Sequence, residues 1–184
     1  MGIWGCRVVV VDDDTDTLEM LSQLLRDQGA DVVAVDQPGA ALATILGVMP
    51  DVLLIDIAMP GLDGVSLIRK LRSLSPERGG RIPAATLSAS SPDAEKLAAW
   101  SAAGFQKHVG KPFDPPAVVT VVGELAGHWV ERRSVALDRG EWPTPRDRRR
   151  ERRGEPPKTL MQGVAGGYEP LLRELVLAGR RQLG

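Results

Sequence analysis

Short runs of consecutive apolar residues alternate with longer segments of helical periodicity along the first 130 residues of the chain. The runs predict five strands, at residues 7–11, 31–35, 52–55, 82–87 and 105–109. Continuous apolar runs of this length are typical of parallel strands that are covered on both faces. The pattern therefore predicts a parallel β-sheet between two layers of helices.

A helix is predicted after each strand, because apolar residues recur there at helical spacing and glycine or proline marks the ends. The expected helices run from Asp14 or Thr15 to Gly29, from Gly39 to Val48, from about Val65 to Leu74, from Asp93 to Gly104, and around Val118 to Trp129. Five such strand and helix units, without a repeat at the sequence level, predict an α/β domain with a doubly wound five-stranded parallel sheet, (βα)5.

The pattern stops after Arg132, and residues 133–184 are expected to form a separate, largely disordered segment. Residues 146–153 contain six arginines, and prolines follow at 156 and 157. Such a composition is typical of a linker. A short amphipathic helix is predicted after Pro170, although a helix of about a dozen residues is only marginally stable alone. The predicted organisation is one domain at 1–132 and a basic tail at 133–184.

Charge is distributed unevenly between these parts. Residues 1–130 contain 10 Lys and Arg against 16 Asp and Glu, a net −6, whereas residues 131–184 contain 13 against 8, a net +5. The arginine-rich stretch could bind nucleic acid through phosphate contacts. Acids interrupt it, however, and aromatic residues for base stacking are scarce, so a solvated linker is the preferred interpretation. The tail also lacks the two patterned helices of a helix-turn-helix.

Composition excludes several classes of protein. Cys6 is the single cysteine, so a disulfide framework is excluded. No segment approaches the roughly 20 apolar residues of a membrane span, and no secretory signal opens the sequence. A cytoplasmic protein without a membrane partner is therefore expected.

Acidic residues stand at the ends of two predicted strands. The first strand leads directly into Asp12, Asp13 and Asp14, and the third leads into Asp56. Parallel strands present their carboxyl ends at one edge of the sheet, where such folds bind ligands. These carboxylates, with Lys111 after the fifth strand, are expected to form an acidic, metal-binding pocket. The alternative is a cluster that only caps the following helix, and for Asp14 alone a cap is the preferred interpretation.

These positions resemble the receiver domain of two-component response regulators, in the same order and over roughly residues 5–130. The matching residues are the acidic pair Asp12 and Asp13, then Asp56, Ser88, and Lys111 with Pro112. The resemblance implies a flavodoxin-like, chemotaxis-regulator-like fold with strand order 2-1-3-4-5. The segment from Ala103 to His108 is closer to the receivers attached to hybrid sensor kinases.

The resemblance implies a phosphoacceptor site with a bound Mg²⁺ ion. Asp56 would accept the phosphoryl group. Asp13, Asp56 and the main-chain carbonyl of Ala58 would hold the ion, together with waters that Asp12 helps to fix. A hard dication held by carboxylates can offset the charge of the phosphodonor.

The other matching residues would act on the phosphoryl group or respond to it. Lys111 would place a cation beside one phosphoryl oxygen, and Ser88 would donate a hydrogen bond to another. Ser88 and His108 are the switch candidates, although His108 stands where the family more often has tyrosine or phenylalanine. Pro112 is the candidate for a cis peptide bond.

The implied function is a response regulator that takes a phosphoryl group from a histidine kinase or phosphotransfer protein and then contacts a downstream protein partner. It is not expected to be an enzyme with a separate substrate, and a homodimer is compatible with it. The alternatives are a nucleic-acid-binding regulator whose basic tail is gated by the receiver, and a degenerate receiver. Haloacid-dehalogenase-like phosphatases also use an aspartate nucleophile, but they usually have a second acid where this chain has Ala58.

Overall fold

The computed structural model describes residues 3–89 and 91–137, and the predicted linker and tail helix lie outside these residues. The chain divides into two units, Met1–Arg132 and Arg133–Gly184. The first unit contains all five strands and the residues of the predicted site. Within the described part of the chain, no helix has both the length and the apolar character needed to cross a membrane.

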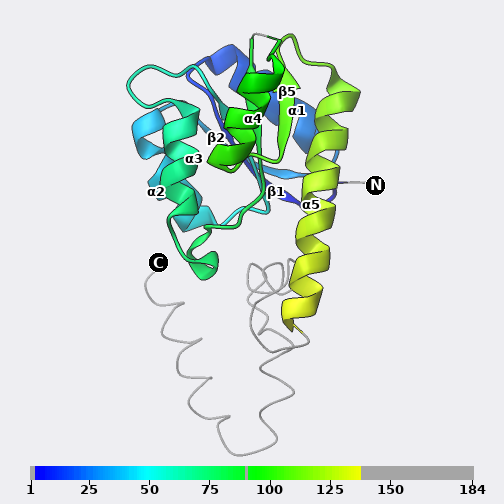
Figure 1. Ribbon diagram of the computed structural model, residues 1–184. Coiled ribbons are helices and arrows are strands. Elements are labelled where there is room, and N and C mark those ends of the chain that lie inside the picture. The colour runs from blue at the N-terminus through cyan, green and yellow to red at the C-terminus, as the bar shows by residue number, and fades with distance from the viewer. Residues whose placement is uncertain (1–2, 90, 138–184) are drawn as a thin grey trace, which may run out of the picture. The chain divides into compact units, whose positions relative to one another are not determined.

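Five parallel strands form one sheet in the order β2-β1-β3-β4-β5, which confirms the predicted doubly wound, flavodoxin-like fold (Figure 1). The strands are β1 (Arg7–Val11), β2 (Asp31–Val35), β3 (Val52–Asp56), β4 (Ala84–Ser88) and β5 (Lys107–Gly110). From β1 the chain moves to β2 on one side and then to β3 on the other. The crevice at the carboxyl ends of β1 and β3 is therefore the place where ligands of such sheets bind.

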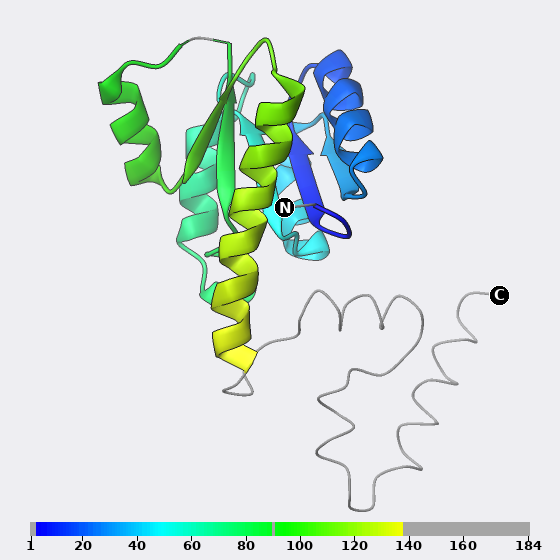
Figure 2. The same ribbon diagram turned by 90° about the vertical axis from the view of Figure 1, so that its right-hand side faces the viewer.

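Helices cover both faces of the sheet (Figures 1 and 2). They are α1 (Thr15–Asp27), α2 (Pro38–Val48), α3 (Gly64–Arg72), α4 (Ala94–Ala103) and α5 (Pro115–Leu137), with a short 3-10 helix at Pro76–Arg78. Helices α1 and α5 pack on one face, whereas α2, α3 and α4 pack on the other. Figure 2 shows α4 and α1 at opposite ends of the sheet.

The side chains of β1 divide between the two layers of the core. Val8 and Val10 pack in the cluster that contains α1 and α5, and Val9 and Val11 pack in the cluster that contains α2, α3 and α4. Successive side chains of a strand point to opposite faces. Because both faces are covered here, the strand is a continuous apolar run rather than an alternating one.

Two strands begin two residues later than predicted. Strand β4 begins at Ala84, after Pro83, which has no N–H to donate to the sheet. Strand β5 begins at Lys107, because the N–H of Phe105 donates to Trp100 O in the turn that ends α4, at 3.1 Å. Both strand starts are thus set by the hydrogen bonds that the backbone N–H groups can make, and the apolar pattern of the sequence does not reveal these bonds.

Helix α5 extends to Leu137, eight residues beyond the predicted end near Trp129. The apolar spacing stops earlier, but residues 128–137 contain no glycine or proline that would end a helix. The predicted end was wrong because helical propensity alone continues a helix beyond its apolar face.

Candidate functional site

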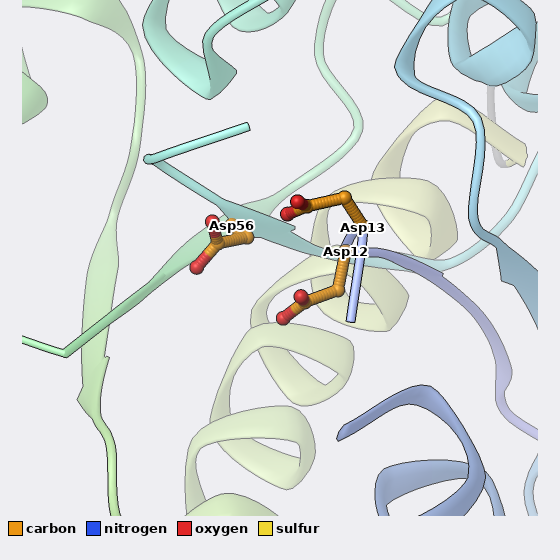
Figure 3. A group of neighbouring side chains, drawn as sticks. All are labelled: Asp12, Asp13 and Asp56. Atoms are coloured by element: carbon orange, nitrogen blue, oxygen red, sulfur yellow. The ribbon is translucent and has the colours of Figure 1, made fainter. Parts of the chain in front are cut away.

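Three carboxylates meet at the carboxyl ends of β1 and β3. Asp12 and Asp13 follow β1, Asp56 ends β3, and one oxygen of each lies within 4.8 Å of the others (Figure 3). Asp12 and Asp56 are only 0% and 4% exposed, whereas Asp13 is exposed to solvent. The parallel topology thus brings together acids that about forty residues separate in the sequence, and one member of the cluster remains open to an approaching ligand.

Asp14 has a separate, structural role. Its carboxylate accepts hydrogen bonds from the Thr17 hydroxyl at 2.9 Å and from the Asp16 N–H at 3.0 Å, so that it caps α1. These hydrogen bonds lower the pKa of Asp14, because they stabilise the ionised carboxylate. The geometry agrees with the interpretation of Asp14 as a helix cap.

Lys111 reaches the cluster from the end of β5. Its Nζ lies 2.7 Å from Asp12 Oδ2 and 2.9 Å from Asp56 Oδ1. Burial alone would lower the pKa of Lys111, but the hydrogen bonds to Asp12 and Asp56 raise it above its usual value. Lys111 is therefore a fixed cation in this site. The peptide bond between Lys111 and Pro112 is cis.

The cluster carries an excess of negative charge. Burial raises the pKa of Asp12, and the hydrogen bond from Lys111 opposes that shift. When all groups are ionised, three carboxylates and one ammonium leave about two negative charges. A hard divalent cation with oxygen ligands offsets this charge. The donor set therefore fits Mg²⁺ better than metals that prefer nitrogen or sulfur.

The backbone after β3 fixes Asp56. Its Oδ2 accepts a hydrogen bond from the Ala58 N–H at 2.9 Å. Gly64, the first residue of α3, lies against the same strand end, where an added Cβ would be 2.2 Å from Asp56 O. Glycine is therefore required for α3 to begin so close to Asp56. The only sequence signal for this contact was the Asp63-Gly64 turn pattern, and the Ala58 carbonyl as a metal ligand stays a prediction.

Ser88 lies at the same edge of the sheet. It is buried at the end of β4, which lies between β3 and β5. Its carbonyl accepts a hydrogen bond from the Lys111 N–H at 2.7 Å, which joins the ends of β4 and β5. The structure thus brings Ser88 to the strand ends that carry Asp56 and Lys111. Its hydrogen bond to a phosphoryl oxygen stays a prediction.

His108 lies beside Thr86 of β4, its partner in the sheet register. Thr86 Oγ1 and His108 Nδ1 are 3.0 Å apart, a hydrogen bond whose donor depends on the imidazole tautomer. The imidazole also packs on Trp100 of α4, with ring centroids 5.3 Å apart. Burial lowers the pKa of His108. Neither Thr86 nor Trp100 could be identified from the sequence as a contact of His108. The only indication for Thr86 was that it alternates, like Ser88, with apolar residues along the strand.

The chain is similar to known proteins over the part that carries the candidate site. Residues 8–123 match the family model of the response regulator receiver domain. An uncharacterized 14.6 kDa protein of Leptolyngbya boryana is 36% identical over 115 residues, which cover 62% of this chain and 86% of that protein. The DNA-binding response regulator MtrA of Mycolicibacterium smegmatis is 33% identical over 116 residues, which cover 63% of this chain and 48% of that protein. The chain thus spans about half the length of this curated regulator.

A solved structure gives a parallel for the metal site. The receiver domain of the sensor histidine kinase PA1611 from Pseudomonas aeruginosa has a magnesium ion coordinated in its active site cleft. It is similar to this chain with a TM-score of 0.60 and 25% sequence identity, covering 67% of this chain and 98% of that domain.

Proposed function

The chain belongs to the response regulator receiver family, and from that premise we propose that it accepts a phosphoryl group on Asp56 and signals through phosphorylation-dependent contacts with other proteins. Receivers are signalling domains, and no separate substrate is proposed. The observation that carries the proposal is the meeting of Asp12, Asp13 and Asp56 with Lys111 at one strand edge. The proposed donor is a histidine kinase or a histidine phosphotransfer protein.

The acidic cluster is proposed to hold Mg²⁺. Asp13, Asp56 and the main-chain carbonyl of Ala58 would be the protein ligands, and Asp12 would fix bound waters. The exposure of Asp13 supports this assignment, because it leaves one side of the cluster open to an ion and its waters. When bound, the ion supplies positive charge that offsets the charges of the donor and of the attacking carboxylate.

Asp56 and its neighbours are proposed to have different roles in the transfer of the phosphoryl group. A carboxylate oxygen of Asp56 forms a bond to phosphorus while the bond from phosphorus to the donor's imidazole nitrogen breaks. The imidazole leaves with that electron pair and takes up a proton from solvent. Lys111, already 2.9 Å from Asp56 Oδ1, then pairs with a phosphoryl oxygen, and the Ser88 hydroxyl donates to another.

Phosphorylation by a small donor tests the proposal directly. The full chain is incubated with acetyl phosphate, with and without Mg²⁺, and its intact mass is measured. We expect the mass of one phosphoryl group to be added only with Mg²⁺, and to be lost in Asp56→Asn. Asp14→Asn is the matched control, because asparagine still caps α1 and Asp14 lies outside the cluster. Phosphorylation of Asp56→Asn at the wild-type level would disprove the assignment of the acceptor.

Nucleic-acid binding is a second candidate, favoured by the net charge of +5 in residues 131–184. It predicts that affinity for duplex DNA falls steeply with salt and is lost when residues 139–184 are deleted. If the full chain does not bind DNA at low salt, this candidate is excluded. The first proposal does not depend on it, since the acidic cluster lies wholly within the first unit.

A further inference from the structure

Helix α4 is attached to the rest of the protein by very little buried surface. Eight of its ten residues are exposed, and only Trp100 and Ala103 are buried. Trp100 is 8% exposed and is the large side chain of this pair. The attachment of α4 to the sheet therefore depends mainly on the packing of the Trp100 indole.

One partner of Trp100 is a titratable ring, and the indole also belongs to the apolar cluster that α2, α3 and α4 form with the sheet. The indole and the His108 imidazole have centroids 5.3 Å apart and planes inclined by 36°. His108 Nδ1 is in turn hydrogen-bonded to Thr86 Oγ1 at 3.0 Å. Thr86 is fully buried, so its hydroxyl depends on this bond. The contact between α4 and the sheet thus includes one group that changes charge near neutral pH.

Other charged groups do not offset a proton on His108. Lys107 precedes it in β5 and points to the opposite face, where it pairs with Glu124. Lys111 follows the end of β5 and pairs with Asp12 and Asp56 of the acidic cluster. The charged residues of α4 and of neighbouring α3 are Glu95, Lys96, Arg69, Lys70 and Arg72, and β4 has none. Among the described residues, burial rather than any of these charges accounts for the lowered pKa of His108.

Two effects oppose each other when His108 is protonated. The imidazolium would gain a cation–π attraction to the Trp100 ring. It would also lose hydration, and in the tautomer whose Nδ1 is unprotonated the new proton would require Thr86 to accept rather than donate. His108 is half-buried against Trp100 and Thr86, and within the described part of the chain no carboxylate forms an ion pair with it, so burial disfavours the imidazolium while α4 is in place. Protonation therefore favours an arrangement in which His108 reaches water.

We propose that His108, Thr86 and Trp100 form a proton-sensitive latch that holds α4 against the sheet at neutral pH and releases it at mildly acidic pH. The latch does not rest on the proposed function, because it needs neither Mg²⁺ nor a phosphodonor. Release would change the exposed surface of α4 without any change at Asp56.

Hydrogen exchange of the unphosphorylated full chain tests the latch. Exchange of the α4 amides, 94–103, is measured at pH 7.5 and 5.5 and corrected for the intrinsic pH dependence of exchange. We expect the opening constant of α4 to rise by at least about threefold across this range, and by no more than the tenfold per pH unit that one proton allows. Amides 8–10 of β1 provide an internal reference for global unfolding.

Two variants distinguish the latch from a general effect of acid. His108→Phe keeps a ring against Trp100 but cannot titrate, so its α4 exchange should be independent of pH. His108→Gln serves the same purpose if the phenylalanine variant does not fold. His128→Gln, which removes the only other histidine, should retain the wild-type response. The proposal is overturned if wild-type α4 shows no pH response, if the response survives in His108→Phe, or if the β1 amides respond equally.

Discussion

Helices α3 and α4 follow neighbouring strands that end at the acidic site, and they pack on the same face of the sheet, yet they are held very differently. Both begin at an aspartate cap: Asp63 accepts from the Ser66 N–H at 2.7 Å, and Asp93 from the Lys96 N–H at 2.8 Å. Helix α3 buries four of its nine residues, whereas α4 buries two of ten. Asp63 also accepts from the Ser66 hydroxyl at 2.8 Å, but the larger difference between the helices is core contact, which supplies most of the stability of helices in proteins.

The difference in burial between α3 and α4 corresponds to a difference in the residues that each helix contacts. The first residue of α3 lies against the Asp56 main chain, so a firmly held α3 keeps the Asp56 carboxylate in place. Helix α4 lies beside His108 and is anchored mainly by Trp100. Segments that move in signalling proteins are drawn from the less stable parts of a fold. The comparison thus assigns a rigid role to α3 and a responsive role to α4.

The largest expected effect is on the free energy of unfolding, when one leucine is replaced by alanine in each of the two helices and the two losses are compared. Leu67 of α3 is 0% exposed, and Leu97 of α4 is 43% exposed. Leu67→Ala should lower the free energy of unfolding by about 2 to 5 kcal/mol, because it leaves a cavity in the core. Leu97→Ala should change it by no more than about 0.5 kcal/mol. Urea denaturation of both variants measures the difference, and similar losses would contradict the comparison.

The strands and the acidic cluster could be predicted from the sequence better than the contacts around α4. All five strands and the meeting of Asp12, Asp13 and Asp56 could be predicted, because buried parallel strands are continuous apolar runs and their carboxyl ends share one edge. The assigned phosphoryl and metal roles of these residues stay predictions.

The contacts around α4 could not be predicted in the same way. The contact between Trp100 and His108, and the hydrogen bond from His108 to Thr86, depend on side chains that meet only after β4, α4 and β5 have packed. The small residues of α4 give no clear apolar face, so its exposure was also not apparent from the pattern.

Arg72 provides the second prediction, because it links the two helices. From the end of α3 it donates two hydrogen bonds to Gly104 O, at 2.8 and 3.1 Å, and one to Gly80 O at 3.2 Å. Gly104 caps α4 and leaves no room for a Cβ beneath the Arg72 side chain. Burial lowers the pKa of Arg72 to about 10, so the guanidinium is still charged at neutral pH.

Arg72→Met should remove these bonds while keeping an apolar stem of similar reach. We expect a loss of about 1 to 3 kcal/mol, the range for hydrogen bonds to a charged group, partly offset by the desolvation cost that disappears with the charge. Hydrogen exchange should accelerate more in α4 than in α3, because α4 has fewer other contacts. Arg69→Met, an exposed substitution in the same helix turn, is the matched control. Equal acceleration in both helices would show that Arg72 supports the domain generally.

The smallest expected effect concerns the two caps. Asp63→Ala should cost about 1 kcal/mol in global unfolding, a typical loss for a helix cap. Asp93→Ala removes the bond from the Lys96 N–H, and because α4 buries little we expect it to open locally, so most of its loss should appear as faster exchange in α4 rather than as a lower global stability. Urea denaturation and hydrogen exchange of the same samples separate these outcomes. A larger global loss for Asp93→Ala would reverse the order proposed for the two helices.

The pH dependence of the stability lost in Asp63→Ala tests whether Asp63 stabilises the protein through its charged carboxylate. Hydrogen bonds from Ser66 lower the pKa of Asp63 below its usual 3.8, so the unfolded chain binds this proton more readily than the folded one. The stabilisation is therefore complete above the unfolded value and is lost as pH falls through the lower, folded pKa. The stability difference between wild type and Asp63→Ala should shrink across that acidic window. If the difference stays constant, the effect comes from helix propensity rather than from the charged cap.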